Sequence, residues 1–239
     1  KGFISLLLLS KEERSIYASS DAFPFAIGRK GEDWAIASET CSFPNLGFEP
    51  CKFLAYREIV SLDESGAKTR LGVPNERKFC PFLHVYYGFP TSDYYGINAE
   101  IVRERCGGFL AEGDDVAADL VLGIADSGLA HSVGYVKRKI ELVRENAKAN
   151  WDQFRRGRMD AGDLEKGMMD LLESITPLRR PLIKYSAGWD RSYIPPTQDR
   201  REVIARHKQI PNPQIIDGMK IILIDDSIRR GTQLRDLLR

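Results

Sequence analysis

The stretch from residue 221 to residue 233 constrains the fold more than any other part of this chain. It reads Ile-Ile-Leu-Ile-Asp-Asp-Ser-Ile-Arg-Arg-Gly-Thr-Gln. A continuous apolar run such as Ile221–Ile224 is typical of a strand that is buried on both faces of a parallel sheet. The acids, the polar turn and the glycine that follow lead into a segment with helical spacing. A strand, a loop and a helix start in this order present free backbone N–H groups and the positive end of the helix dipole, which predicts an anion-binding loop.

The side chains of this loop predict the ligand. Asp225 and Asp226 are suited to hold ribose hydroxyls or a Mg²⁺-bound pyrophosphate, and residues Arg230–Gln233 are suited to surround a phosphate. The predicted ligand is therefore a sugar with phosphates at both ends. Many doubly wound proteins end a core strand in acids, for Mg²⁺ or for solvation alone. The pair followed by Ser-Ile-x-Arg-Gly-Thr is more specific, and it resembles the phosphoribosyl pyrophosphate (PRPP) loop of type I phosphoribosyltransferases.

The composition is that of an ordinary globular protein. The chain has 239 residues, of which 43% are hydrophobic and 29% charged, and its formal net charge is +1. This balance gives no reason to expect nucleic acid or a membrane as a partner. The four cysteines are widely spaced and form no Cys-x-x-Cys pair, which favours the reducing cytoplasm. Because the chain starts at Lys1 without methionine and stops at Arg239, we expect a fragment cut at both ends.

Residues 1–73 have a β-rich pattern that is typical of part of a sandwich. The predicted strands are Gly2–Leu9, Ser15–Ala18, Phe23–Gly28, Trp34–Ser38 and Glu58–Leu62. The last of these is followed by the hairpin-like turn Asp63-Glu64-Ser65-Gly66.

In residues 74–239, strands and helices alternate, which predicts an open parallel α/β sheet. The predicted strands are Phe82–Tyr87, Leu120–Ile124, Pro181–Tyr185 and Lys220–Ile224, and the predicted helices are Ile97–Leu110, one that begins near Leu129, and Gln198–Lys208. An insertion between about residues 136 and 180 favours two further helices, Val136–Gln153 and Ala161–Ile175. We interpret its arginine cluster (Arg155, Arg156, Arg158) as part of a solvated helix connection rather than a site for an acidic partner.

Two further loops complete the predicted site. Asp126-Ser127-Gly128 follows a strand end, and its glycine allows a positive φ and a close backbone approach to an anion. As the second of two parallel strand ends, it is a candidate pyrophosphate site. The segment Lys184–Gln198 mixes basic, aromatic, glycine and proline residues, which suits either a lid over an anionic substrate or a structured surface loop. His131 is expected to cap a helix or to pack in the core rather than to contact a ligand.

With these three loops in order, the chain resembles the glutamine PRPP amidotransferase (amidophosphoribosyltransferase) family over nearly its whole length. Ser20–Gly28 followed by Ala37–Thr40 is similar to the late part of that family's glutaminase domain, and Cys80–Tyr87 with Pro90–Ser92 is similar to the strand that opens its transferase domain. Asp126–Gly128 with Gly134–Tyr135, Lys184–Gln198 and Asp225–Thr232 resemble its pyrophosphate loop, flexible loop and PRPP loop.

The resemblance implies an α/β type I phosphoribosyltransferase domain with an open parallel sheet, preceded by the C-terminal part of an N-terminal-nucleophile glutaminase β-sandwich. It implies an enzyme in which glutamine-derived ammonia displaces pyrophosphate from Mg²⁺-PRPP and gives 5-phosphoribosylamine, the first step of de novo purine synthesis. PRPP and glutamine or ammonia would be its partners, Mg²⁺ its cofactor, the cytoplasm its location and a homo-oligomer its assembly. Some members carry an iron–sulfur cluster, and Cys80 stands at a ligand-like position, but no cluster is expected here.

The resemblance also implies a role for each loop. Ser127, Asp225 and Asp226 would hold Mg²⁺, and the two acids would also hold the ribose hydroxyls. Lys184 and Arg191 would act as catalytic residues that neutralise the leaving pyrophosphate. The other PRPP-binding residues would be Asp126, Gly128, Ser227, Arg230, Gly231, Thr232 and Gln233. This chemistry asks for positioning and charge neutralisation more than for a strong base.

The chain departs from the family's pattern at several positions. The family's Gly-Ile-Arg-Pro-Leu is replaced by residues Ala22–Ala26, Ala125 stands in place of a proline, and Arg229 in place of an aliphatic residue. The helical insertion is longer than the family's connection, and the nucleophilic cysteine is not among these residues. We therefore expect a divergent paralogue that is inactive with glutamine as this fragment alone. The alternatives are a PRPP-binding regulatory paralogue without transferase activity, and a nucleobase phosphoribosyltransferase, which would not need the β-rich residues 1–73.

Overall fold

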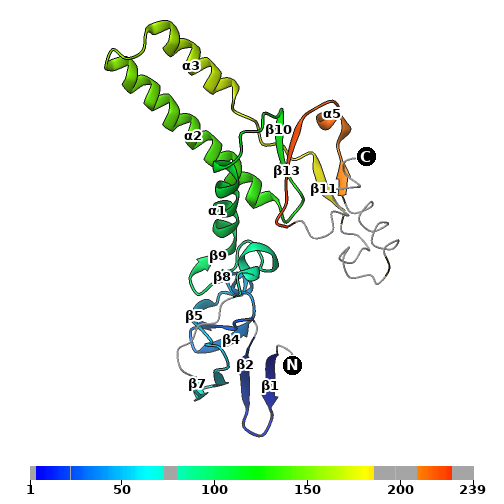
Figure 1. Ribbon diagram of the computed structural model, residues 1–239. Coiled ribbons are helices and arrows are strands. Elements are labelled where there is room, and N and C mark those ends of the chain that lie inside the picture. Colours follow the sequence, from blue (N-terminus) through cyan, green and yellow to red (C-terminus); the bar gives the residue numbers. More distant parts are fainter. Residues whose placement is uncertain (1–3, 22, 73–79, 186–196, 198–208, 228–239) are drawn as a thin grey trace. The chain divides into compact units, whose positions relative to one another are not determined.

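The structure, a computed structural model, describes residues 4–21, 23–72, 80–185, 197 and 209–227 (Figure 1). It consists of two compact units, residues 1–102 and residues 103–239. The predicted helix Gln198–Lys208 and most of the predicted lid lie outside the described residues. Each unit is described separately below.

The N-terminal unit contains two antiparallel sheets, which confirms the predicted β-rich character. One sheet has the order β1 (Ser5–Ser10), β2 (Ser15–Ser20), β6 (Ile59–Asp63), β7 (Gly66–Leu71), and the other has the order β4 (Asp33–Ala37), β3 (Ala26–Lys30), β5 (Glu49–Phe53). Both sheets contribute to one apolar core, in which Ala18, Ile27 and Val60 are fully buried. The predicted turn at Asp63–Gly66 joins β6 to β7 as a hairpin.

One predicted strand is wrong. Residues Leu83–Tyr87 form the short helix η3, with Pro81 just before it. An extended strand would place successive side chains on opposite faces, whereas here the adjacent Leu83 and His84 are both buried, and the ring of His84 lies 5.2 Å from that of Tyr94. The aromatic residues raised the strand propensity, but in the structure Leu83 and His84 both pack with Tyr94, and the helical turn allows this.

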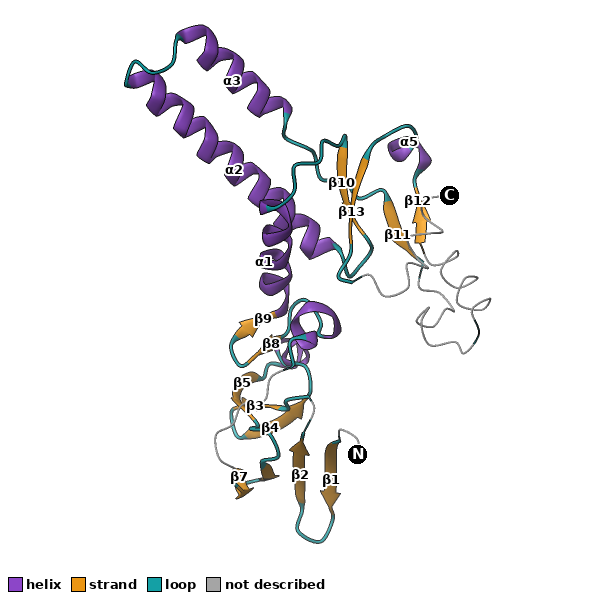
Figure 2. Ribbon diagram, viewed as in Figure 1, coloured by secondary structure: helices purple, strands orange, loops and turns teal. Residues whose placement is uncertain are grey.

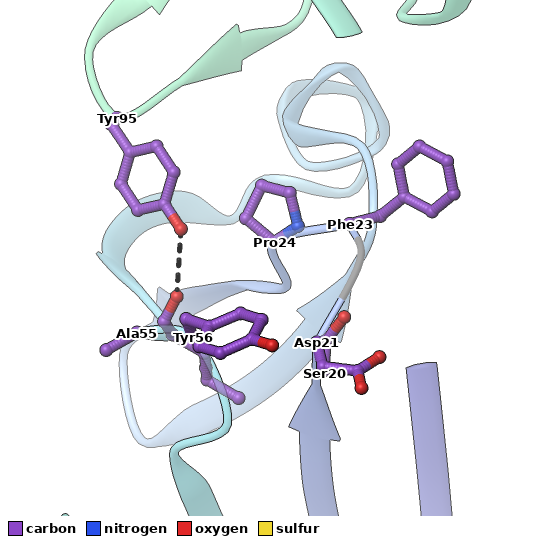
Figure 3. Close-up of a pocket in the computed structure, with 8 residues that line it drawn as sticks. Ser20, Asp21, Phe23, Pro24, Ala55, Tyr56 and Tyr95 are labelled. Carbon is purple, nitrogen blue, oxygen red and sulfur yellow. Dashed lines mark hydrogen bonds between the residues drawn. The ribbon is translucent and has the colours of Figure 1, made fainter. Parts of the chain in front are cut away.

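The residues that follow η3 pack within the N-terminal unit. They form β8 (Asp93–Tyr94) and β9 (Ile97–Asn98), and β8 contacts the short helix η1 (Thr40–Ser42), which is followed by η2 (Pro44–Leu46). Thr40 Oγ1 accepts from Asp93 N at 2.8 Å, and the Tyr94 hydroxyl donates to Glu39 at 2.7 Å. The Tyr95 hydroxyl donates to the carbonyl of Leu54 at 3.1 Å, as Figure 3 shows. The predicted border near residue 73 stays a prediction.

The second unit is built on two parallel strands, and other elements of the unit pack on both faces of this pair (Figure 2). Its elements are α1 (Ala99–Glu112, which begins in the first unit), β10 (Leu120–Gly123), α2 (Leu129–Arg155), α3 (Ala161–Glu173), β11 (Leu182–Lys184), β12 (Gln209–Pro211), α5 (Pro213–Ile216) and β13 (Ile221–Ile224). Ala111 of α1 and Tyr135 of α2 pack on one face of the strand pair, and Leu182 of β11 packs on the other. Burial on both faces explains the continuous apolar runs in β10 and β13.

Two features of this unit differ in detail from the predicted α/β sheet. Strand β11 pairs antiparallel with β12 instead of joining β10 and β13, so the parallel sheet in the described residues has two strands. The predicted insertion is a helical hairpin of α2 and α3, and α2 is continuous with the helix that follows Gly128. None of the helices in the described part of the chain combines the length and apolar character of a membrane span.

Candidate functional site at two parallel strand ends

The two predicted acid-rich loops leave the same edge of the parallel sheet. Gly123 at the end of β10 is in register with Ile224 at the end of β13, and Ile124 N donates to Ile224 O at 2.8 Å. The loop at residues 125–128 and the segment at residues 225–227 therefore emerge side by side (Figure 1). The carboxyl edge of parallel strands is where open α/β sheets bind their ligands.

Close backbone approach requires the glycine of the first loop. A Cβ on Gly128 would lie 2.2 Å from Ile224 O and 2.7 Å from Ile124 N, distances that no side chain tolerates. The φ of Gly128 is −83°, so the glycine does not adopt the positive φ that it would allow, and steric room is the reason for glycine here. Gly128 also starts α2, where its carbonyl accepts from Ser132 N at 2.9 Å. The loop is thus held tightly against both strands.

The side chains of the two loops meet at Ser127 and Asp225. Ser127 Oγ donates to Asp225 Oδ1 at 3.0 Å, and the backbone N–H of Asp226 donates to the same oxygen at 2.9 Å. Ser227 Oγ donates to Asp226 Oδ1 at 2.9 Å. The predicted grouping of Ser127 with the two acids is therefore present in the structure.

Both carboxyl groups hold their protons more tightly than usual. Burial, with the nearby charge of Asp226, raises the pKa of Asp225 to about 6, although the hydrogen bonds from the Asp226 backbone and the Ser127 hydroxyl oppose the rise. Burial also raises the pKa of Asp226. Two partly buried acids side by side are costly when both are ionised, and a cation or hydroxyl donors from a ligand would relieve that cost.

The first residue of the predicted lid reaches the first loop. Lys184 Nζ, at the end of β11, lies 3.1 Å from Asp126 Oδ2. The neighbouring strand β12 contributes Gln209, whose Nε2 donates to Ala125 O at 2.6 Å and whose Oε1 is buried without a partner among the described residues. Strands β11 and β12 therefore connect Lys184, the first residue of the predicted lid, and Gln209 to the strand-end loop.

The structure brings together seven of the predicted site residues. These are Asp126, Ser127, Gly128, Lys184, Asp225, Asp226 and Ser227. The other five, Arg191, Arg230, Gly231, Thr232 and Gln233, lie outside the described residues. Sequence reasoning missed Gln209, for which we find no signal in the sequence. The expected capping or core role of His131 is confirmed, because its ring is buried and its Nδ1 lies 3.1 Å from the carbonyl oxygen of Ser127, just before α2.

The donor set at the strand ends fits a magnesium ion that is shared with a substrate. It consists of two carboxylates and one hydroxyl, and within the described ranges no group of three or more His, Cys, Asp or Glu side chains could hold a metal ion. Mg²⁺ typically binds through one or two carboxylates together with substrate phosphates and water. Asp226 Oδ2, which is buried and has no hydrogen-bond partner among the described residues, is an acceptor of the required kind.

A second hollow lies in the N-terminal unit (Figure 3). Its lining residues are Ser20, Asp21, Phe23, Pro24, Leu54, Ala55, Tyr56 and Tyr95. Asp21 is the acidic residue there, and its Oδ1 already accepts from Ile4 N at 2.6 Å while Oδ2 lies 3.7 Å from Arg57. This carboxylate is therefore engaged in holding the ends of β1 and β2.

Comparisons with known proteins give related sequences and structures. No protein-family model matches the chain. The amidophosphoribosyltransferase of Bacillus subtilis (strain 168) is 26% identical over 240 residues, which cover 100% of this chain and 43% of the relative. The amidophosphoribosyltransferase of Synechocystis sp. is 30% identical over 220 residues, which cover 90% of this chain and 37% of the relative. The solved structure of glutamine PRPP amidotransferase from B. subtilis, complexed with ADP and GMP, matches with a TM-score of 0.70 and 26% identity, over 98% of this chain and 44% of that chain. The chain thus spans about two fifths of the length of the relatives it matches.

Proposed function

We propose that this chain is part of an enzyme similar to the amidophosphoribosyltransferases. The enzyme binds Mg²⁺-PRPP at the carboxyl ends of β10 and β13 and replaces its pyrophosphate with ammonia. In this reaction the bond between ribose C1 and a pyrophosphate oxygen breaks as the ammonia nitrogen bonds to C1, and the nitrogen then loses a proton. The product is 5-phosphoribosylamine, and glutamine is the proposed source of ammonia.

The hydrogen bond between Ser127 and Asp225, at 3.0 Å, is the observation that carries this proposal. It joins two loops that are far apart in sequence and that the PRPP chemistry needs together, one for pyrophosphate and one for ribose. The supporting observation is the pair of partly buried acids, whose pKa values are raised chiefly by burial, so that a cation or hydroxyl donors would stabilise their ionised forms.

Each described residue has a definite part in the proposed site. Asp225 and Asp226 accept hydrogen bonds from the ribose hydroxyls and, with Ser127, supply oxygens to Mg²⁺. The backbone N–H groups at the start of α2 face the pyrophosphate, and Lys184 moves from Asp126 to the phosphate charge when substrate binds. Mg²⁺, when bound with PRPP, offsets the charge that gathers on the leaving pyrophosphate. By resemblance, Arg191 assists Lys184, and Arg230, Gly231, Thr232 and Gln233 hold the 5′-phosphate.

The wider properties of the enzyme are part of the same proposal. The antiparallel sheets of residues 4–72 are the C-terminal part of a glutaminase domain of the N-terminal-nucleophile type. The cytoplasm is the proposed location and a homo-oligomer the proposed assembly, as the resemblance implies.

The decisive experiment measures pyrophosphate release from Mg²⁺-PRPP by the full-length protein, once with ammonia and once with glutamine. The test variant is Asp225→Asn with Asp226→Asn, which keeps the shape of both side chains. The matched control is Asp119→Asn, because Asp119 accepts from Lys220 N at 2.7 Å at the opposite end of the same strand pair. We expect the double variant to lose release and the control to keep it.

The possible results separate three cases. Release with ammonia but not with glutamine would support the transferase activity and refute the use of glutamine as the source of ammonia. PRPP binding without release would favour a regulatory paralogue instead of an enzyme, which the departures at Ala125 and Arg229 would then explain. Equal turnover in the double variant and the wild type would refute the assignment of the site.

A further inference from the structure

A buried glutamine contacts the backbone of the first strand-end loop. Gln209, the first residue of β12, is 5% exposed. Its side-chain amide lies 2.6 Å from the carbonyl oxygen of Ala125, which is itself buried and directly precedes Asp126. Because a carbonyl oxygen can only accept, the amide nitrogen Nε2 faces it and donates. The contact is therefore a buried hydrogen bond from a side chain to the backbone of a segment 84 residues away.

The strand pairing places this amide beside Lys184. Gln209 and Lys184 are directly opposed in the antiparallel pair of β12 and β11, so their side chains lie on the same face of the pair. Leu182, two residues before Lys184, shares this face and is buried in the core. Lys184 Nζ lies 3.1 Å from Asp126 Oδ2. The opposed pair thus holds two successive loop residues, Ala125 by its backbone and Asp126 by its side chain.

The amide of Gln209 is only half satisfied. Its Oε1 is buried and has no hydrogen-bond partner in the described part of the chain. A buried acceptor without a partner destabilises a fold, whereas an apolar side chain of similar volume would fill the same space without that cost. The hydrogen bond from Nε2 to the loop is therefore what the amide contributes at this position.

A bond to this carbonyl orients more than one atom of the loop. Ala125 O and the N–H of Asp126 belong to one planar peptide group, so the hydrogen bond from Gln209 also fixes the direction of that N–H. The next turn is closed by Gly128 N, which donates to Ile124 O at 2.7 Å. Backbone N–H groups in a turn before a helix are the groups that bind phosphate oxygens. The orientation of these groups therefore depends on β12.

We propose that Gln209 is a positioning residue that fixes the backbone of residues 125–128 in the orientation that binds the pyrophosphate of PRPP. The inference rests on the proposed function, since this loop is the proposed pyrophosphate site. Gln209 acts through the peptide group between Ala125 and Asp126 and does not itself touch the substrate. Because the ribose and the 5′-phosphate are assigned to residues 225–233, Gln209 affects the pyrophosphate end of the ligand.

Two substitutions in the full-length protein test this role. Gln209→Met keeps the length of the side chain without a donor, and Gln209→Asn keeps the amide on a side chain that is too short to reach Ala125 O. Gln214→Met is the control for residue type, because Gln214 of α5 is exposed. Leu182→Val is the control for stability, because it weakens the core contact of β11 and leaves the glutamine in place. We measure Tm, kcat and KM for pyrophosphate release, and Kd for Mg²⁺-PRPP, Mg²⁺-pyrophosphate and ribose 5-phosphate.

We expect both Gln209 variants to raise the Kd for Mg²⁺-PRPP and for Mg²⁺-pyrophosphate about three- to tenfold, as for the loss of one neutral hydrogen bond. The Kd for ribose 5-phosphate should stay that of the wild type. Both controls should bind all three ligands like the wild type, although Leu182→Val lowers Tm. If Gln209→Met does not fold, Gln209→Asn gives the same comparison.

Two results would overturn the inference. One is an unchanged Kd for Mg²⁺-PRPP and Mg²⁺-pyrophosphate in the folded Gln209 variants. The other is an equal loss of affinity for pyrophosphate and ribose 5-phosphate, which would indicate a general structural role. Absence of Mg²⁺-PRPP binding by the wild type would instead overturn the proposed function.

Discussion

We predict that replacing Asp225 by asparagine makes the ligand-free protein more stable and abolishes its binding of Mg²⁺-PRPP. The pKa of Asp225 is about 6 in the folded protein, against an ordinary value of 3.8. Each pKa unit corresponds to about 1.4 kcal/mol, so ionised Asp225 costs the ligand-free fold at most about 3 kcal/mol. Part of this cost belongs jointly to Asp226, whose charge raises the pKa of Asp225. We therefore expect Asp225→Asn to raise the free energy of unfolding at pH 7.5 by about 1–3 kcal/mol.

The geometry makes asparagine a suitable replacement. Asp225 Oδ1 accepts from Ser127 Oγ and from Asp226 N, and the amide oxygen of asparagine can accept both bonds. The substitution therefore removes the charge and keeps the shape and the two described contacts. The same change should abolish Mg²⁺-PRPP binding, because the ribose and the metal need the carboxylate. Sites that bind ligands are often less stable than the rest of the fold would allow.

The dependence on pH follows from the sign of the pKa change. A raised carboxyl pKa means that the folded state binds the proton more tightly than the unfolded state does, so stability falls as the pH rises from about 4 to about 6. The gain from Asp225→Asn should be close to zero near pH 4, grow across this window and stay constant above it. Thermal unfolding of the ligand-free protein at several pH values measures this gain, and 1 kcal/mol corresponds to roughly 2–4 °C in Tm for a chain of this size.

An opposite control is available in the same unit. The pKa of Asp114 is lowered, chiefly by the hydrogen bond from the Tyr135 hydroxyl, so Asp114→Asn should destabilise the protein at neutral pH. A Tm for Asp225→Asn at or below that of the wild type at pH 7.5 would refute the argument that Asp225 carries uncompensated charge.

Three further predictions follow from particular contacts. Gly107→Ala should destabilise the protein by more than about 2 kcal/mol in urea unfolding, since its Cβ would lie 1.8 Å from a backbone oxygen. Gly108→Ala is the control: its Cβ would lie 3.7 Å from the nearest atom, so the change should be neutral or stabilising by up to about 1 kcal/mol. Glu58→Gln should cost about 2 kcal/mol or more at pH 7, because the buried carboxylate accepts from Lys52 at 2.5 Å and from Thr69 at 2.7 Å. Burial alone would raise the pKa of Glu58, but these hydrogen bonds lower it below 4.5. The loss of stability in Glu58→Gln should therefore shrink as the pH falls through that lowered pKa, and a loss that stays constant down to pH 3 would contradict this. Lys184→Ala should change the free energy of unfolding by less than about 1 kcal/mol, because the pair of Lys184 with Asp126 is partly exposed, and it should slow pyrophosphate release. Unchanged release would show that Lys184 is not part of the site.

The sequence was informative where a local pattern and the fold require the same thing. Ile221–Ile224 and Leu120–Ile124 are apolar throughout because both faces of the strand pair are covered, and they were predicted almost to the residue. The grouping of Ser127 with Asp225 followed from the rule that parallel strands end at one edge of a sheet. The second insertion helix was predicted from its spacing, and the structure adds its N-cap, Asp160, whose side chain accepts from Asp163 N.

Long-range contacts decided the features that the sequence did not reveal. Leu83 and His84 form a helical turn because Tyr94, in a later strand, provides the surface that buries both. Gly128 is required because of the carbonyl of Ile224, a neighbour that exists only after β13 has joined β10. Neither the helical turn nor the need for glycine can be predicted from the adjacent residues, because the contacting residue in each case comes from a later segment of the chain.

His131 shows how these two kinds of information combine at a functional site. Its distance of four residues from Ser127 is a local fact, and by itself it predicts only a helix-capping or core histidine. The burial of His131 and its backbone contact with Gly107 depend on the arrival of α1, a segment that lies well before it in the sequence.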